Sequence, residues 1–164
     1  MGGEREGKLE MKVNKEAREM ENEIKKDWVG DILVKEGGTL TLPLCVEVEY
    51  IEVREGATLT LLDCRKAGYI EVREGGTLTL PACVEAGDIS VWKGATLTLP
   101  VCEKAGSIIV WEGATLTLNA CKEAEDISVW KGATLTLPVC EKAGSIVVWE
   151  GTLNAPLLRI RRGI

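Results

Sequence analysis

The strongest constraint on this chain is a unit of 19 residues that is repeated six times along most of its length. A representative copy reads G-A-T-L-T-L-P-V-C-E-K-A-G-S-I-I-V-W-E. Cysteine marks the interval at Cys45, Cys64, Cys83, Cys102, Cys121 and Cys140. A unit this short cannot bury its own apolar face, so its copies must stack on one another. The repeat therefore predicts a solenoid.

Two stretches of each unit, T-L-T-L and I-x-V-W, alternate with the period of 2 that is typical of β-strands. Alternation predicts the orientation of eight side chains in one copy: Leu97, Leu99, Ile108 and Val110 inward, and Thr96, Thr98, Ile109 and Trp111 outward. Gly113 marks the corner between the strands, where we expect a positive φ. At the other corner, one helical turn would face both Cys102 and Ala105 inward. We predict an all-β parallel β-solenoid (a β-helix) of about seven 19-residue coils.

The two ends depart from the repeat and predict caps, which protect the unpaired strand edges of a solenoid. Residues 9–13 alternate as in a strand, and residues 15–28 show a helical pattern. We expect three regions: an N-terminal cap of a strand plus an α-helical cap (1–30), the β-solenoid repeats (31–151) and a C-terminal cap (152–164). The last unit lacks one Ala after Gly151, so the register should shift there by one residue.

Two kinds of solenoid fit this pattern, and the sequence leaves both open. One is a β-helix with sharp corners, and the other is a leucine-rich-repeat-like horseshoe with one strand and a turn per unit. The pattern G-S-I-x-V-x-E-G-A-T-L-T-L-P resembles the tandem repeats of bacterial β-helix and leucine-rich-repeat-like proteins over about residues 30–158. This resemblance implies a fold and little about activity.

A second period of 38 residues appears in the later units, where 88–113 match 126–151 at nearly every position. Charges alternate along two stacked columns: Lys93, Glu112, Lys131 and Glu150, and Glu103, Lys122 and Glu141. Alternation avoids like charges in neighbouring coils, which would repel at about 5 Å. Such regularity indicates either a designed protein or a recent duplication.

Composition argues against several classes of function. The net charge of −6 opposes nucleic acid and anionic membranes as partners, and no apolar run is long enough for a membrane span. Without a signal peptide, we expect a cytoplasmic protein with reduced cysteines. The absence of His and of a C-x-x-C motif predicts no metal site, no cofactor and no enzyme activity. Pairs such as Glu71/Arg73 and Glu52/Arg54 are interpreted as a solvated face.

An outward column of tryptophans is the first candidate site. It comprises Trp92, Trp111, Trp130 and Trp149, with Ile109 and Val147 beside it. An apolar stripe on the outside of a protein usually marks an interface, so this column predicts a homo-oligomer. The alternative is that the indoles stack on one another within one chain and need no partner.

Two outward columns of threonine are the second candidate site: Thr39, Thr58, Thr77, Thr96, Thr115 and Thr134, and Thr41, Thr60, Thr79, Thr98, Thr117 and Thr136. They resemble the Thr-x-Thr arrays of insect antifreeze β-solenoids, which implies ice as a partner. The antifreeze coils are shorter and often braced by disulfides, which distinguishes them from this chain. The alternative is that Thr is an ordinary solvent-facing strand residue.

The cysteine column is interpreted as a row of buried small apolar side chains. Stacked coils bring neighbouring cysteines close, but parallel side chains have poor geometry for a disulfide. Together these features predict a non-enzymatic structural repeat scaffold that presents flat residue ladders for self-association or protein binding. Ice binding by the threonine face is the alternative.

Overall fold

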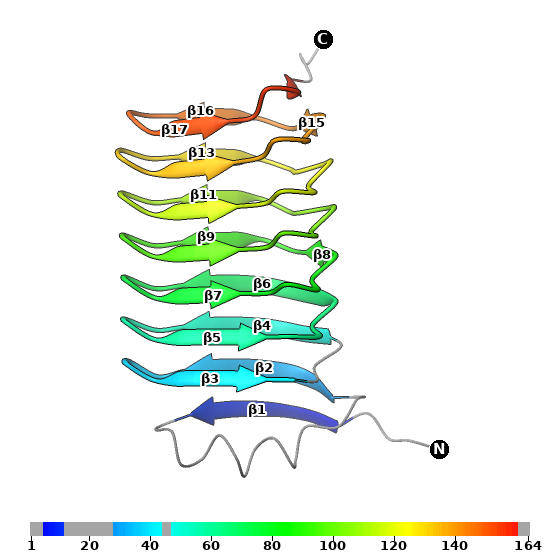
Figure 1. Cartoon of the computed structure of the whole chain (residues 1–164), viewed down its shortest axis with the longest axis vertical. Coiled ribbons are helices and arrows are strands. Elements are labelled where there is room, and N and C mark those ends of the chain that lie inside the picture. The colour runs from blue at the N-terminus through cyan, green and yellow to red at the C-terminus, as the bar shows by residue number, and fades with distance from the viewer. Residues whose placement is uncertain (1–4, 12–27, 44–46, 161–164) are drawn as a thin grey trace.

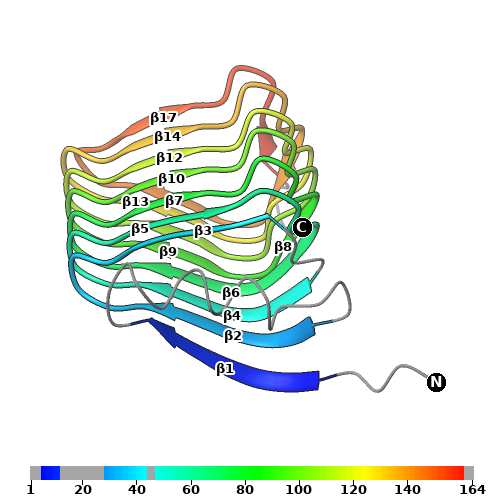
Figure 2. The same ribbon diagram turned by 60° about the horizontal axis from the view of Figure 1, so that its bottom comes forward.

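The structure, a computed structural model, describes residues 5–11, 28–43 and 47–160. This part of the chain is an all-β parallel solenoid in which each coil lies directly on the one before it (Figure 1). Two sheets face each other across the core, and a shorter third side closes each coil (Figure 2). In the described ranges, no helix is long and apolar enough to cross a membrane.

One sheet has nine strands, and we call it the tryptophan sheet because the tryptophan column follows its later strands. Its strands are β1 (Arg5–Met11), β2 (Trp28–Val34), β4 (Glu47–Val53), β6 (Lys66–Val72), β8 (Glu85–Ala86), β9 (Ile89–Val91), β11 (Ile108–Val110), β13 (Ile127–Val129) and β16 (Ile146–Val148). They pair in the order β1-β2-β4-β6-β9-β11-β13-β16, and β8 pairs with β6. β1 includes residues 9–11 of the strand expected at residues 9–13, and its Leu9 pairs with Ile32 of β2. Residues 12 and 13 lie outside the described residues.

The second sheet, the threonine sheet, has seven strands. They are β3 (Thr39–Leu42), β5 (Thr58–Leu61), β7 (Thr77–Thr79), β10 (Thr96–Thr98), β12 (Thr115–Thr117), β14 (Thr134–Thr136) and β17 (Thr152–Asn154). About six full turns join them, against the prediction of about seven coils. Each unit gives a strand to both sheets, as a β-helix requires and a one-strand horseshoe does not.

The third side carries one or two paired residues per coil. Isolated parallel bridges join Glu85, Lys104, Glu123 and Lys142 in succession, and β15 (Lys142–Ala143) pairs with β18 (Arg159–Ile160). A helical turn at this corner is wrong for the described residues. A single turn from Cys102 N–H to Leu99 O (3.4 Å) is followed by extended chain. Cys102 and Ala105 still face inward, as predicted. The predicted N-terminal capping helix falls on residues 12–27, outside the described residues.

The core is a continuous stack of aliphatic side chains in register. Thr96 pairs with Thr115 and Leu97 with Leu116, so each core residue lies on its own copy one coil away. The side chains predicted to point inward, Leu97, Leu99, Ile108 and Val110, are fully buried, and those predicted to point outward are half-buried or exposed. Strands that are so closely matched fill the interior without aromatic residues.

The turn between the two sheets uses a left-handed glycine in every full unit. The residues are Gly37, Gly56, Gly75, Gly94, Gly113 and Gly132, with φ between 62° and 68°. This confirms the conformation expected at Gly113. In the last coil the turn is one residue shorter, because Thr134 pairs with Thr152. Glu150 takes the left-handed position there (φ 51°), so the predicted shift in register is confirmed.

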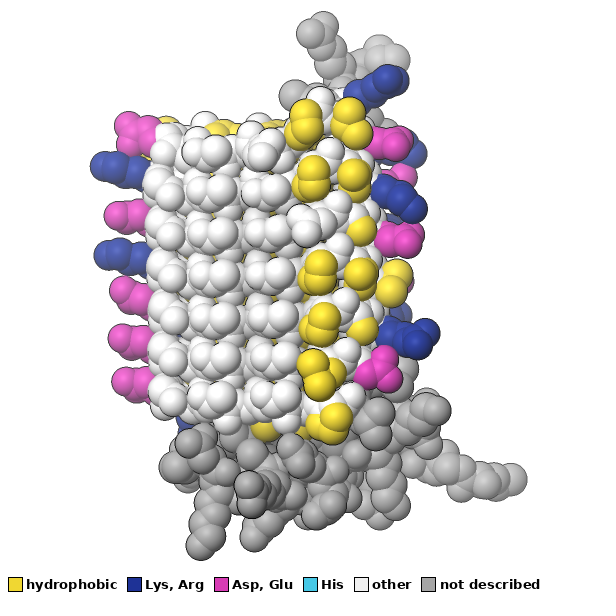
Figure 3. All heavy atoms as spheres, in the orientation of Figure 1, with side chains coloured by type: hydrophobic (Ala, Val, Ile, Leu, Met, Phe, Trp, Pro, Cys, Tyr) yellow, Lys and Arg dark blue, Asp and Glu magenta, His cyan; other side chains and the backbone are white. Residues whose placement is uncertain are grey.

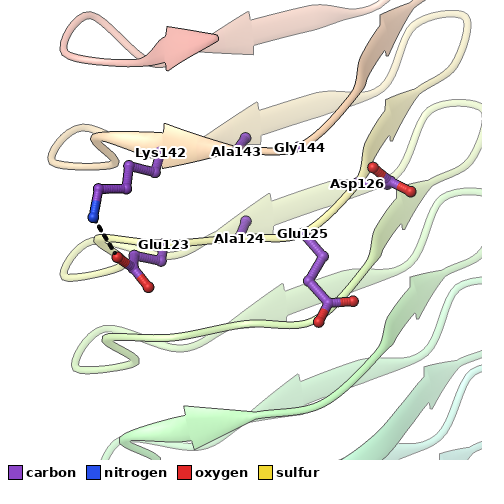
Figure 4. Close-up of a pocket in the computed structure, with 7 residues that line it drawn as sticks. All are labelled: Glu123, Ala124, Glu125, Asp126, Lys142, Ala143 and Gly144. Carbon is purple, nitrogen blue, oxygen red and sulfur yellow. Dashed lines mark hydrogen bonds and ion pairs between the residues drawn. The ribbon is translucent and has the colours of Figure 1, made fainter. Parts of the chain in front are cut away.

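A second glycine position is required by space rather than by φ. A Cβ on Gly87 would lie 2.6 Å from the carbonyl oxygen of Gly68, one coil below. The same column holds Gly106 and Gly144, but Glu125 interrupts it. A hollow of about 410 Å³ opens beside Glu125 between two coils (Figure 4). Ala124 at its floor is only half-buried, whereas the other alanines of its column, Ala67, Ala86, Ala105 and Ala143, are buried.

Glu125→Gly should close this hollow and raise the free energy of unfolding by about 1 kcal/mol, through burial of the Ala124 methyl group. Denaturant unfolding followed by circular dichroism measures the change. Glu125→Ala is the matched control, because it removes the same charge but keeps the Cβ. An Ala variant as stable as the Gly variant would show that charge, and not space, opens the corner.

Candidate functional surfaces

The threonine sheet presents a flat, uncharged grid. The two predicted columns lie in unbroken parallel register, and every threonine in them is exposed or half-buried. Figure 3 shows the grid bordered on one side by a column of charged side chains and on the other by a hydrophobic stripe. The exposed apolar residues of that corner are Leu62, Val101, Val139 and Leu157. Thr has a stiff χ1, so a regular backbone gives a regular pattern of methyl and hydroxyl groups.

The grid is one rank longer than the sequence indicated. Thr152 pairs with Thr134 and extends the first column, while Asn154 pairs with Thr136 and ends the second. The repeat interval failed to include Thr152 because the missing Ala shortens the last step from 19 residues to 18. The T-L-N sequence at 152–154 was the available signal.

The tryptophan column forms an intramolecular stack. The ring centroids of Trp92 and Trp111 lie 5.3 Å apart and those of Trp111 and Trp130 5.5 Å apart, with interplanar angles of 19° and 10°. The Arg73 guanidinium lies 5.1 Å from the centroid of the Trp92 ring. Trp149 departs from the stack, because its ring meets Trp130 edge-on at 85°. For the first three indoles, the alternative of stacking within one chain describes the geometry observed.

Whether an indole N–H has a hydrogen-bond acceptor depends on the residue 21 positions earlier in the chain. The Nε1 of Trp92 donates to Glu71 Oε1 (2.9 Å), and the Nε1 of Trp111 donates to Ser90 Oγ (3.2 Å). The residue at this distance from Trp130 is Ile109, which has no acceptor. Among the described residues, Trp130 Nε1 is the buried side-chain polar atom without a hydrogen-bond partner.

The last coil leaves its apolar residues uncovered. Val148 occupies the inward column of Val110 and Val129, yet it is 42% exposed, whereas Val129 is 1% exposed. On the outer face of the same coil, Val147 is 53% and Trp149 57% exposed. These two residues are the most exposed members of the predicted interface set. The others, including Ile109, are half-buried within the column.

The interpretation of Glu52 and Glu71 as a solvated face is wrong, because they are only 8% and 6% exposed. Glu71 accepts hydrogen bonds from Tyr50 Oη (2.8 Å) and Trp92 Nε1 (2.9 Å), and pairs with Arg73 at 3.1 Å. Tyr50 and Trp92, from the coils on either side, thus contact the Glu71 carboxylate. Glu52 instead pairs with Arg54 (3.2 Å) and Arg73 (3.6 Å). Burial, with the hydrogen bond to Glu71, raises the pKa of Tyr50.

Ion pairs join charged residues of successive coils. Of the predicted columns, Lys122 pairs with Glu103 (3.3 Å) and Lys131 with Glu150 (3.9 Å). The third side adds a ladder that the sequence analysis missed: Glu47, Lys66, Glu85, Lys104, Glu123 and Lys142 alternate in sign. Its Lys142–Glu123 pair is 2.9 Å long. Exposed pairs contribute about 0–1 kcal/mol each, so their main effect is to favour one register.

The described cysteines confirm the expectation of buried thiols. Cys83, Cys102, Cys121 and Cys140 form no disulfide and have no exposed surface. Burial raises the pKa of the Cys102 thiol to about 11, so it is protonated at neutral pH. Each thiol donates to the carbonyl oxygen two residues on, as Cys102 Sγ does to Lys104 O (3.2 Å).

Two acidic residues beside the hollow at Glu125, namely Glu123 and Asp126, have polar partners in the next coil. Lys142 neutralises Glu123 (Figure 4). Ser145 donates both its N–H (2.9 Å) and its hydroxyl (2.7 Å) to Asp126. The Ser145 backbone N–H, followed by its hydroxyl, lowers the pKa of Asp126. Over the described residues, no three His, Cys, Asp or Glu side chains gather around one point where a metal ion could bind.

Comparison of the chain with protein-family models, with curated proteins and with solved structures finds no match.

Ile109→Ser should give the Trp130 N–H an acceptor and raise the free energy of unfolding, because a buried donor without a partner costs about 1–3 kcal/mol. Ser90→Ile makes the reverse change below Trp111 and should lower it by a similar amount. Denaturant unfolding of both variants measures the two effects. Changes of the same sign in both would contradict this role of the residue 21 positions earlier.

Proposed function

We propose that the chain is a non-enzymatic structural scaffold, a rigid rod that associates end to end with a second copy of itself. The observation that carries the proposal is the uncovered last coil, where Val148 is exposed although every equivalent inward valine is buried. The tryptophan column supplies the outer part of the same surface through Trp149 and Val147. The stack along the rest of the column stabilises the rod.

The unpaired strand edges of the last coil also favour association at this end of the rod. β16 and β17 are the outermost strands of their sheets, and no described strand pairs with their outer edges. An open edge is a template for another strand, and a second copy offers edges of the same length and sequence. A two-fold axis perpendicular to the rod would pair β17 with its counterpart in antiparallel orientation and would bury both apolar ends.

Charge favours this arrangement. Glu150 lies in the turn at one end of β17, whereas Arg159 lies beyond its other end, next to Lys142 on the third side. Antiparallel pairing places the acidic end of each copy over the basic end of the other. Complementary charges at the rim set the orientation of such a contact.

Val147→Ser/Trp149→Ser should abolish a dimer that the unchanged chain forms at micromolar concentration, because these are the exposed apolar residues on the outer face of the last coil. Sedimentation velocity or light scattering after gel filtration gives the mass. Trp111→Ser is the matched control, since it removes an indole from the middle of the stack and should leave a dimer. A chain that is monomeric at every concentration, or a dimer lost only with Trp111, would overturn end-to-end association.

A second candidate function, ice binding, is favoured by the charge-free grid of the threonine sheet. Its two columns resemble those of insect antifreeze β-solenoids in being flat, exposed and periodic in both directions. The strands repeat at about 4.8 Å and alternate residues at about 6.7 Å, so the hydroxyl groups form a two-dimensional lattice. This surface lies on a side of the rod and not at its end, so both functions are compatible.

Thr98→Lys should abolish thermal hysteresis and ice-crystal shaping, because one charged side chain breaks the flat grid at its centre. Val84→Lys, at an exposed position of the third side, is the control and should keep full activity. No hysteresis from the unchanged chain, or equal loss in both variants, would count against an ice-binding face.

A further inference from the structure

The buried cysteines form a straight ladder with one thiol per coil. Cys102 and its counterparts Cys83, Cys121 and Cys140 are all fully buried in the core. Coils repeat at about 4.8 Å, so we expect equivalent atoms of neighbouring cysteines to lie about that far apart. A disulfide needs about 2.05 Å between sulfur atoms, which this spacing cannot supply without moving the backbone. Among the described residues, the buried cysteines accordingly form no disulfide.

The same spacing matches the distance between two thiolates that bind one metal ion. A thiolate–metal bond is about 2.3 Å long, so a metal ion in line between two thiolates separates them by about 4.6 Å. The parallel register sets the Cβ–Sγ bonds across the rod axis, which gives the bent C–S–metal angle that thiolates prefer. A soft d10 cation that favours two collinear ligands fits this gap. Two thiolates and a divalent cation leave no net charge, which suits an apolar core.

We propose that adjacent cysteines of the ladder, such as Cys121 and Cys140, bind one soft divalent cation of the mercury(II) type in linear bis-thiolate coordination. The two S–H bonds are replaced by two S–metal bonds, and both protons pass to solvent. No electrons are transferred. The site needs only two ligands, so it is consistent with the absence of larger ligand clusters in the described chain.

When the thiols lose their protons, each carbonyl oxygen that accepted from a thiol still accepts a hydrogen bond from a backbone N–H. The carbonyl of Lys104, which accepts from Cys102, also accepts from Ala86 N–H (3.0 Å) in the coil below. The carbonyl of Glu123, which accepts from Cys121, likewise accepts from Ala105 N–H (3.0 Å). Each carbonyl therefore keeps one hydrogen bond when the sulfur binds a metal.

The ladder ends at the open end of the rod. Leu158 N–H donates to Ala155 O (3.2 Å), as Cys140 N–H donates to Leu137 O (3.3 Å), so Leu158 occupies the next cysteine position. Leu158 is only half-buried, whereas Cys140 beneath it is fully buried. Local opening of this last coil is the route by which an ion reaches the ladder.

The test compares two variants that each keep three cysteines. Cys45→Ala/Cys64→Ala/Cys83→Ala keeps three adjacent thiols, and Cys45→Ala/Cys83→Ala/Cys121→Ala keeps three thiols that are two coils apart. After incubation with mercury(II) chloride and gel filtration in excess glutathione, the first should retain about one ion per chain and unfold at a higher temperature. The second should retain none, since a single protein thiolate exchanges with glutathione.

Equal retention by both variants would mean that isolated thiols bind the ion, and loss from both would mean that the ladder does not. Circular dichroism checks that both variants fold. X-ray absorption of the unchanged chain loaded with mercury(II) is independent of the variants. Two sulfur neighbours in a linear arrangement are expected, and three or four would overturn the proposal.

Discussion

Backbone hydrogen bonds between residues one coil apart are the interaction on which the rest of this molecule depends. Thr96 N–H donates to Gly76 O, and the equivalent Thr115 N–H donates to Ala95 O, both at 2.9 Å. Such bonds satisfy the backbone inside the rod and fix each residue above its counterpart. A side chain is therefore repeated as a column, and the column acquires properties that one copy lacks. Flatness, ring stacking and a line of thiols all come from this one constraint.

The period of 2 within the repeat predicted the inward and outward side chains of the two facing strands in one unit, because alternation in a strand is a local property. Burial of the outer face could not be predicted in this way. Glu71 looked solvated beside Arg73, but its environment is set by Tyr50 and Trp92 from the coils on either side. The third side was missed because one or two paired residues per unit have no alternation to detect. Its 19-residue steps of Glu and Lys were a signal, at positions interpreted as a helical turn.

The candidate surfaces differ in how many of their side-chain groups find a partner within the same chain. The first three indoles have ring partners above or below, and two of them have an acceptor for the N–H group. The threonines are exposed or half-buried along a whole sheet. Columns were predictable from the repeat, but the place where a column stops was not, since the end depends on the single missing Ala. At that end, apolar side chains are exposed and the outermost described strands have an unpaired edge. The proposed contact between copies lies there.

Because charges alternate from coil to coil, the later part of the rod can be extended without like-charge contacts only by two units at a time. Adding one 19-residue copy to the later coils would set Lys upon Lys, or Glu upon Glu, in three columns at once, and would break the Asp126–Ser145 type of pairing between neighbours. Adding a pair of copies preserves every one of these contacts. An array of this kind can lengthen or shorten by 38 residues without repulsion, so its coils act as dimers of units whose two members are chemically distinct.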